Sequence, residues 1–351
     1  MNVKPLFKLM VDKKASDLFF TTYSPVMIKI DGKIMPVNQV DLTPKMVRQA
    51  ALELMTEQQL EQFTRDFEIY FAISEPGLGR FRVNVFHQRG NVAMVLRFVT
   101  ADLPTLDSLG MPEILKDTIM LRRGLILMVG ASGSGKSTTL AAMIDHRNKN
   151  SASHIVTIED PIEFLHGNHK SIVNQREVGL DTLSYHRALR SAMREAPDVI
   201  LIGEIRDRET MQAAIDLAGT GHLAIATLHA NNSPETLDRI INMYPNEQHK
   251  QVLMDLAQYI RVIISQRLVR AKEGRRVAAV EVMLNTPHFS ELILKGDISR
   301  VKEAFKDAKE PGMQSFDHAL FELYRRGSIS MEEALSNADS RSNLEAKINF
   351  G

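Results

Sequence analysis

Gly130-Ala131-Ser132-Gly133-Ser134-Gly135-Lys136-Ser137 is the stretch that decides how this chain folds. It follows an apolar run at residues 125–129 and precedes a pattern typical of a helix. The order of its glycines, lysine and serine is that of a phosphate-binding P-loop, which lies between a strand and a helix. A glycine-rich turn that happens to precede Lys-Ser is the weaker reading, because both flanking elements are expected here.

Each residue type in this stretch has a physical reason. Glycines let backbone N–H groups curl round phosphates at a helix N-terminus. Lys136 would place its charge on the β- and γ-phosphates, and the Ser137 hydroxyl would complete the shell of a Mg²⁺ ion. The sequence therefore predicts ATP and Mg²⁺ as cofactors, with contacts from Gly130, Ala131, Ser132, Gly133, Ser134, Gly135, Lys136, Ser137 and Thr138.

Short apolar strands alternate with helices beyond about residue 113, which predicts a mostly parallel α/β sheet covered on both faces. The expected strands are residues 125–129, 155–158, 199–202 and 223–227, with helices at 136–147, 184–195 and 208–218. Further helices are expected around 233–244 and across 253–268, and the remainder reads as helical.

The first hundred residues predict a smaller α+β unit. It contains a hairpin at 26–37, a helix over 44–67 and strands at 80–86 and 91–99, after a short amphipathic helix near the N-terminus. We therefore expect an N-terminal domain at 1–100, a linker at 101–115 and a nucleotide-binding core with a helical C-terminal region at 116–351.

Composition narrows the class of protein. The 351 residues carry 43 basic and 43 acidic side chains and no cysteine. The absence of cysteine excludes disulfides, thiolate catalysis and cysteine-ligated zinc. The balance of charges argues against binding nucleic acid through bulk charge. Since a secreted disulfide scaffold is excluded, we expect a cytoplasmic protein, and no apolar run approaches the length of a membrane span.

Acidic residues follow two of the expected strands. Glu204 comes directly after residues 199–202, and Glu159, Asp160 and Glu163 follow residues 155–158. Ligands bind at the carboxyl ends of such strands, and phosphate hydrolysis needs a carboxylate that orients or deprotonates water. We expect functional roles for Glu204 and Glu163, with Glu159 and Asp160 either near the metal or shaping the loop.

Histidines and arginines leave alternatives open. His222 and His229 flank the strand at 223–228, and His229 either senses the γ-phosphate or makes only structural hydrogen bonds. Arg80, Arg82 and Arg97 lie on strands of the N-terminal unit, where they could act as arginine fingers. A stripe on the helix from residue 184 is more simply a solvated or subunit-facing surface: Arg187, Arg190 and Arg194.

Four motifs in order resemble those of the secretion-ATPase superfamily, and specifically its pilus-retraction branch, the PilT/PilU family. They are the P-loop, an acidic box at 157–163, an atypical Walker B at 202–207 and a histidine box at 220–229. Residues 15–18 and 79–84 match the N-terminal domain of that family.

The resemblance implies a PAS-like N-terminal domain joined to a RecA-like ATPase core in a homo-hexameric ring. It implies that Glu163 activates water, that Glu204 is the Walker B acid behind Mg²⁺ and that His229 contacts the γ-phosphate. Arg82 and Arg97 would reach the nucleotide. ATP turnover would turn a platform protein in the inner membrane, at whose base the ring would sit, and so withdraw pilin subunits.

Within this branch, the chain looks more like the PilU-type subgroup. It lacks the tetracysteine zinc module of assembly ATPases, and residues 288–295 lack both arginines of the PilT-type motif. The resemblance therefore implies an ATPase that drives or assists retraction beside a PilT-type motor. The alternative is an adaptor ring that binds nucleotide with little turnover. A nucleic-acid motor is disfavoured because the sequence has no tryptophan and no basic groove.

Overall fold

The computed structural model describes residues 3–100, 102–306 and 310–350. The chain divides into two compact units, which are treated separately below. The first unit contains Met1–Asp102 and Glu163–Leu165, and the second contains Leu103–Ile162 and His166–Gly351. No helix of the described residues has the length and apolar character needed to cross a membrane.

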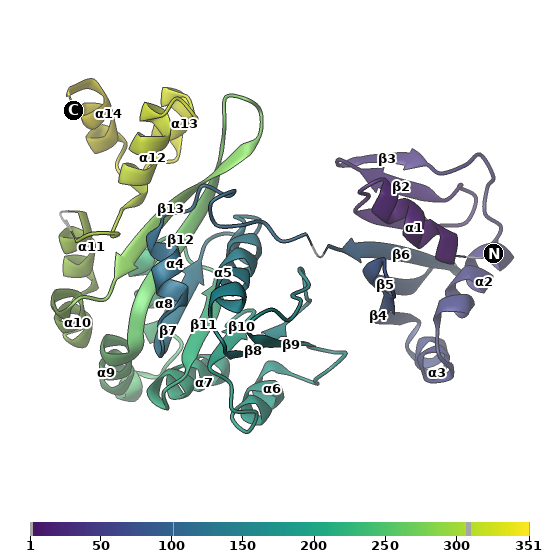
Figure 1. Cartoon of the computed structure of the whole chain (residues 1–351), viewed down its shortest axis with the longest axis horizontal. Coiled ribbons are helices and arrows are strands. Elements are labelled where there is room, and N and C mark those ends of the chain that lie inside the picture. Colours follow the sequence, from purple (N-terminus) through teal and green to yellow (C-terminus); the bar gives the residue numbers. More distant parts are fainter. Residues whose placement is uncertain (1–2, 101, 307–309, 351) are drawn as a thin grey trace. The chain divides into compact units, whose positions relative to one another are not determined.

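The first unit is an antiparallel sheet with helices packed on it (Figure 1). The strand order is β3-β2-β1-β6-β5-β4. The strands are β1 Asp17–Phe20, β2 Met27–Ile30, β3 Lys33–Pro36, β4 Glu68–Glu75, β5 Gly79–Gln88 and β6 Asn91–Val99. The helices are α1 Lys4–Asp12, α2 Pro44–Leu54 and α3 Glu57–Asp66.

Alternate side chains of strand β5 point into the core of this unit. Phe81, Val83 and Val85 point to one side of β5 and are fully buried. The Phe7 ring of α1 stacks on the Phe81 ring with 4.4 Å between centroids. This packing confirms the predicted N-terminal amphipathic helix, and the β2–β3 pairing confirms the predicted hairpin.

The helix predicted over residues 44–67 is wrong as a single element. Met55 has an extended backbone, with ψ of 144°, and ends α2. Thr56 then begins α3 with a capping box: its hydroxyl accepts from Gln59 N, and the Gln59 side chain accepts from Thr56 N. A threonine followed three residues later by glutamine is a helix-start signal, which divides the apolar pattern into two helices.

The second unit is built on a seven-stranded sheet in the order β13-β12-β7-β11-β10-β8-β9. All neighbours are parallel except β12 and β13. The strands are β7 Gly124–Val129, β8 His154–Glu159, β9 Ile172–Glu177, β10 Val199–Ile202, β11 Leu223–Leu228, β12 Ile260–Arg270 and β13 Arg276–Leu284. The four predicted strands are confirmed.

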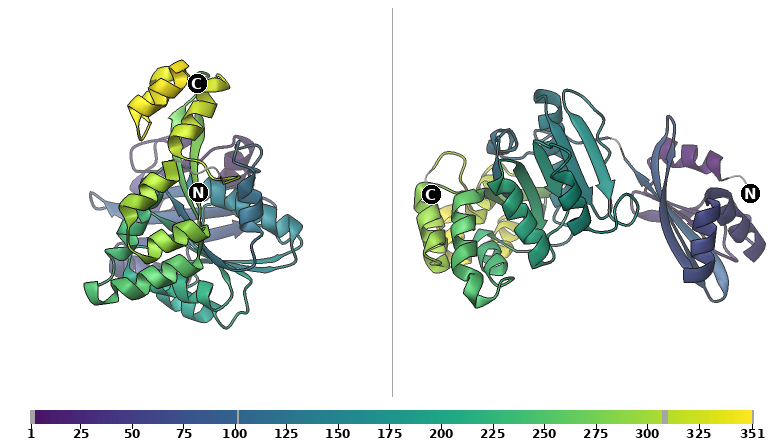
Figure 2. Two further views of the ribbon diagram at one scale, coloured as in Figure 1. Left: turned by 90° about the vertical axis from the view of Figure 1, so that its left-hand side faces the viewer. Right: turned by 90° about the horizontal axis from the view of Figure 1, so that it is seen from below.

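Helices cover both faces of this sheet (Figure 2). Leu125, Leu127 and Val129 of β7 face one apolar cluster, and Ile126 and Met128 face the other. The covering helices are α4 Ile114–Ile119, α5 Lys136–Asn150, α6 Tyr185–Ala192, α7 Arg208–Gly219, α8 Ser233–Ile241, the 3-10 helix Asn246–Gln248, α9 His249–Tyr259 and α10 Pro287–Leu294. The predicted doubly covered parallel sheet is confirmed.

The helix predicted across residues 253–268 is wrong in its second half. Helix α9 ends at Tyr259, and the chain continues at once as β12. Ile260, Val262, Ile263 and Ile264 are β-branched, and such residues favour a pleated, buried strand over a helix. Strand β13 likewise corrects the expectation that the remainder is helical. Helices α11 Ile298–Lys306, α12 Phe316–Arg325, α13 Met331–Ser336 and α14 Arg341–Phe350 follow.

Candidate nucleotide-binding and hydrolysis site

The P-loop lies where the sequence places it, between β7 and α5. Gly130, Gly133 and Gly135 have φ angles of +151°, +75° and +87°, a region that side chains rarely adopt. A Cβ on Gly130 would lie 2.5 Å from the Gln266 carbonyl oxygen. Glycine is therefore required at the first position both by conformation and by the closeness of β12.

Lys136 is the first residue of α5 and points back over the loop. Its ammonium donates to the carbonyl oxygens of Gly130 (2.7 Å) and Ala131 (3.0 Å). Ser137 and Thr138 follow in the first turn, where Ser137 is exposed and Thr138 half-buried. The loop thus presents a cation and hydroxyls at a helix N-terminus, which is an arrangement that binds phosphate.

A strand distant in sequence braces this loop, and sequence reasoning missed it. The buried Gln266 of β12 donates from Nε2 to the Ser134 carbonyl oxygen (2.8 Å). Its Oε1 accepts from the Thr139 hydroxyl (2.8 Å). The one available signal was a polar residue within an apolar run.

Glu204 and His229 lie together at the carboxyl edge of the sheet. Glu204 follows β10 and His229 follows β11, and these strands are parallel neighbours. His229 Nε2 is 2.8 Å from Glu204 Oε1, and both side chains are partly exposed. His229 is therefore placed against a carboxylate rather than in a core, as a functional histidine would be.

Arg206 joins the two acidic segments. It donates to Glu204 Oε2 from Nε (2.8 Å) and Nη2 (2.7 Å), and its Nη1 lies 3.7 Å from Asp160 Oδ2. The hydrogen bond to Glu204 raises the pKa of Arg206. Tyr185 packs behind them, and its pKa is raised by burial and by the nearby charge of Asp160.

The acidic box separates into two parts. Glu159 ends β8, and its Oε1 accepts from the Thr157 hydroxyl (2.7 Å) and from Gln175 Nε2 (3.1 Å). These bonds favour the interpretation that Glu159 shapes the loop. Glu163 is exposed and belongs to the first unit, where the neighbouring Leu165 donates its N–H to the Thr100 carbonyl oxygen (3.3 Å).

Arg82 and Arg97 face each other across β5 and β6 of the first unit. Arg97 donates to Asp17 Oδ1 (2.7 Å), and Asp17 is buried although Arg97 is half-exposed. The Arg82 Nη1 atom is buried and has no hydrogen-bond partner among the described residues. Asp17 thus compensates part of the repulsion between two cross-strand arginines.

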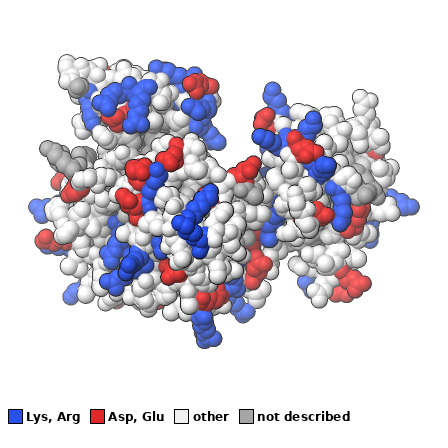
Figure 3. Space-filling view, in the orientation of Figure 1, with Lys and Arg blue, Asp and Glu red and all other residues white. Residues whose placement is uncertain are grey.

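His222 and the arginine stripe lie apart from the Glu204–His229 contact. His222 Nδ1 lies 3.1 Å from the Thr220 hydroxyl and 3.2 Å from the Leu217 carbonyl oxygen, at the opposite end of β11 from His229. Exposed side chains form the predicted stripe on and after α6: Arg187, Arg190 and Arg194. Acidic and basic side chains are intermixed over the visible face of the second unit (Figure 3).

A cavity of about 270 Å³ lies beside the P-loop, lined also by Asn231, Arg267 and Asn337. The buried Ser134 hydroxyl of this loop has no partner among the described residues, and the glycine cradle is open at Gly133. These features fit a triphosphate. The described residues contain no cluster of three metal-ligating side chains, so a Mg²⁺ here would rely on Ser137, the phosphates, water and Glu204.

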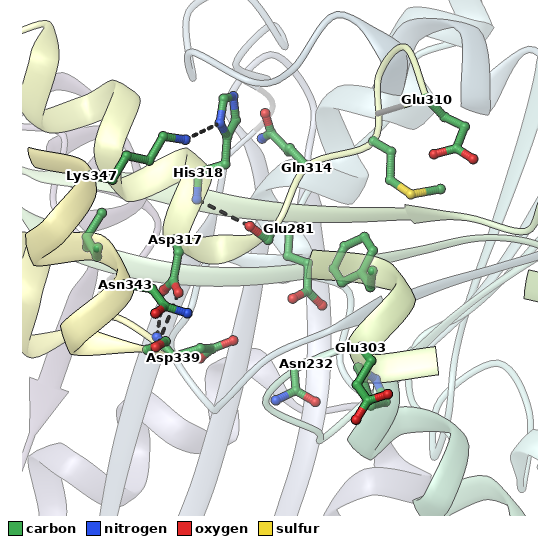
Figure 4. A pocket seen from close by; sticks show the side chains of 16 residues that line it. Asn232, Glu281, Glu303, Glu310, Gln314, Asp317, His318, Asp339, Asn343 and Lys347 are labelled. Atoms are coloured by element: carbon green, nitrogen blue, oxygen red, sulfur yellow. Dashed lines mark hydrogen bonds between the residues drawn. The ribbon is translucent and has the colours of Figure 1, made fainter. Parts of the chain in front are cut away.

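A larger cavity, of about 1410 Å³, lies between the sheet and the C-terminal helices (Figure 4). It is lined by Glu281, Asp317, His318, Asp339 and Lys347 among others, and by none of the predicted catalytic residues. Burial raises the pKa of Glu281 to about 7. We place the candidate phosphate site at the smaller cavity because residues 130–134 of the P-loop line it.

Comparisons with known proteins agree with this site. The Type II/IV secretion system protein family matches residues 2–335. The type IV pilus ATPase PilU of Pseudomonas aeruginosa is 50% identical over 100% of this chain and 92% of its own length. The retraction ATPase PilT of the same organism is 40% identical over 96% and 98%. The crystal structure of the pilus retraction motor PilT with bound ADP superposes with a TM-score of 0.91 at 38% identity, covering 98% of this chain and 99% of that one.

The fold, the P-loop and these similarities define the class: the chain is an ATP-hydrolysing P-loop enzyme with a RecA-like core and a smaller N-terminal domain. It belongs to the PilT/PilU family of type IV pilus retraction ATPases. The family and fold class predicted from the four motifs are confirmed, as is the greater likeness to PilU than to PilT.

Proposed function

We propose that this chain is a PilU-type motor ATPase that hydrolyses Mg²⁺-ATP to drive or assist type IV pilus retraction, and so twitching motility. The observation that carries the proposal is the 50% identity to PilU along the whole chain. The contact between Glu204 and His229 at the carboxyl edge of the sheet also supports the proposal. An ATPase needs groups beside the γ-phosphate that respond to its presence.

In this proposal the P-loop holds ATP. Residues 130–138 cradle the phosphates, and Lys136 turns from the loop carbonyls to the β- and γ-phosphates. Ser137 would hold Mg²⁺ directly and Glu204 through a water. The ion, when bound, neutralises charge on the phosphate oxygens.

Hydrolysis then needs one proton acceptor. Glu163 takes a proton from a water whose oxygen bonds to the γ-phosphorus. The bond from that phosphorus to the β–γ bridging oxygen breaks, and its electrons leave on ADP. His229, held by Glu204, contacts the γ-phosphate. Arg82 and Arg97 are proposed to stabilise the developing negative charge.

We propose a homo-hexamer that works beside a PilT-type ATPase and acts on an inner-membrane platform protein from the cytoplasmic side. We also retain the division into an N-terminal domain at 1–100, a linker at 101–115 and the ATPase core at 116–351. The accessory role is favoured by α10, whose sequence Pro287–Leu294 lacks the arginines expected of the PilT-type motif.

The test is ATP turnover by the purified chain with Mg²⁺, with mass measured in the same buffer. Wild type is compared with Lys136→Ala, Glu163→Gln and the exposed control Glu57→Gln. We expect hexamers whose turnover disappears in the first two variants and persists in the control. Turnover unaffected by Glu163→Gln would refute its assignment as the proton acceptor.

The same variants, tested in cells, distinguish the motor from the adaptor ring. If Glu163→Gln and Lys136→Ala leave pilus retraction unchanged in a strain that contains a PilT-type motor, nucleotide turnover by this chain is dispensable. The motor proposal would then be replaced by the adaptor ring.

A further inference from the structure

Strand β12 packs against Gly130, the first residue of the phosphate loop. Ser265 of β12 is in register with Val129, the last residue of β7. Gln266 therefore lies beside Gly130, where the loop leaves the sheet. The Gln266 carbonyl oxygen is so close that a Cβ on Gly130 would be 2.5 Å from it, and Nε2 would be 2.8 Å from a Cβ on Gly135.

The Gln266 amide uses both of its ends within the P-loop region. Nε2 donates to the carbonyl of Ser134, two residues before Lys136, and Oε1 accepts from the hydroxyl of Thr139, three residues after it. Gln266 and Thr139 are 2% and 1% exposed. The bridge thus spans Lys136 and links the loop to the first turn of α5.

We propose that Gln266 is a positioning residue for ATP binding: it fixes the direction in which the loop and the α5 N-terminus present their N–H groups to the phosphates. The inference deepens the proposed function, since it rests on ATP binding at this loop. Gln266 lines the cavity beside the loop, and both ends of its side-chain amide are bonded to Ser134 and Thr139.

Only a side chain with a donor and an acceptor in one plane can make this bridge. A glutamate of the same shape would place an acceptor against the Ser134 carbonyl oxygen, and a leucine would leave that carbonyl and the Thr139 hydroxyl unsatisfied. The backbone N–H groups expected to bind phosphate belong to this loop, whose glycines allow more backbone conformations than other residues would.

The experiment measures steady-state turnover and affinity for a fluorescent ADP analogue in the full-length protein. The variants are Gln266→Glu, Thr139→Val and Thr139→Ser, with the exposed Gln58→Glu as the control for added charge. For Gln266→Glu we expect KM for ATP and Kd for the analogue to rise about tenfold, with kcat changed less than about threefold. Thr139→Val should show a rise in the same direction, and Thr139→Ser, which keeps the hydroxyl, should restore values close to wild type.

Separate controls distinguish a variant that has lost its fold from a wrong assignment of the ATP site. Thermal unfolding without nucleotide identifies a variant that has lost its fold, and the Thr139→Val and Thr139→Ser pair still tests the bridge if Gln266→Glu is unfolded. Folded variants with unchanged KM and analogue affinity would overturn the inference. Unchanged nucleotide affinity in Lys136→Ala would instead overturn the assignment of ATP to this loop.

Discussion

His229 Nε2 and Glu204 Oε1 lie 2.8 Å apart, although the two residues follow different strands. The parallel pairing of β10 with β11 brings them together, since Ile202 is in register with Ala226 near both strand ends. A displacement of one of these side chains will therefore change the contact that the other makes.

The first prediction concerns this pair. We expect Glu204→Gln to lower ATP turnover by about 100-fold or more while nucleotide affinity stays within a few-fold, because the carboxylate is proposed to act on the reacting groups rather than on binding. Turnover and affinity for an ADP analogue are measured side by side. His229→Ala should also slow turnover, and His222→Ala, at the far end of β11, should not. Equal effects of the two histidine variants would contradict the separation of their roles.

The second prediction concerns the glycines of the P-loop. Gly130→Ala combines a φ of +151° with a Cβ 2.5 Å from the Gln266 carbonyl oxygen, whereas Gly133→Ala has a φ of +75° but open space around it. We expect Gly133→Ala to cost about 1–2 kcal/mol from backbone strain alone. Gly130→Ala should cost more and should abolish binding of the ADP analogue. Calorimetry and analogue titration check both, and a smaller loss of stability in Gly130→Ala would contradict the close packing of β12.

The third prediction concerns Asp17 and Arg97. Arg97→Ala leaves the buried Asp17 carboxylate without its cation, and among the described residues the Ser16 hydroxyl still donates to it at 2.8 Å. We expect the first unit to lose about 1–2 kcal/mol, less than for a fully buried pair because Arg97 is half-exposed. Faster hydrogen exchange in peptides from β1 and β6 is the measurement. Asp17→Asn combined with Arg97→Ala should recover part of the loss, and no recovery would argue against the ion pair as its source.

The fourth prediction concerns pH and Glu281. Burial raises its pKa from 4.5 to about 7, the charge of Asp339 adds to the rise, and hydrogen bonds from Ser233 and Ser265 oppose it. A raised pKa means that the folded state favours the protonated acid. Its contribution is therefore complete below pH 4.5 and is lost as the pH rises through about 7.

The measurement is the free energy of unfolding between pH 5 and 8.5 for wild type and Glu281→Gln. Relative to the variant, wild type should lose on the order of 3 kcal/mol across this range, because the pKa of Glu281 is raised from 4.5 to about 7. Glu303→Gln, an exposed residue at the same cavity, is the control. Parallel pH profiles for wild type and Glu281→Gln would contradict the buried, protonatable carboxyl.

Most of the fold of the second unit could be predicted from local sequence patterns. The P-loop, Glu204 and His229 each follow a short, wholly buried strand, and such strands stand out from the helices between them. Sequence alone therefore predicted that Glu204 lies near the P-loop at the carboxyl edge of the sheet, whereas it left the role of His229 open.

The errors arose where periodicity is ambiguous. An apolar run such as Ile260–Ile264 fits a buried helix or a buried strand, and only its β-branched residues favour the strand. The Gln266 bridge could not be predicted for a different reason: it depends on the pairing of β12 with a strand more than a hundred residues earlier. Asp17 and Arg97 are likewise joined by strand register rather than by proximity in sequence.

Neighbouring side chains of β12 point to opposite sides, and this makes the strand sensitive to length. Gln266 faces the phosphate loop, whereas the Arg267 guanidinium lies 3.9 Å from the centre of the Phe316 ring and pairs with Asp339 (2.7 Å). A single-residue insertion or deletion between Val262 and Gln266, after the register shift at Ile260–Val262, would exchange these two faces, and a change of two residues would preserve them. Among relatives of this chain, the number of residues between Val262 and Gln266 should thus vary in steps of two, if it varies at all.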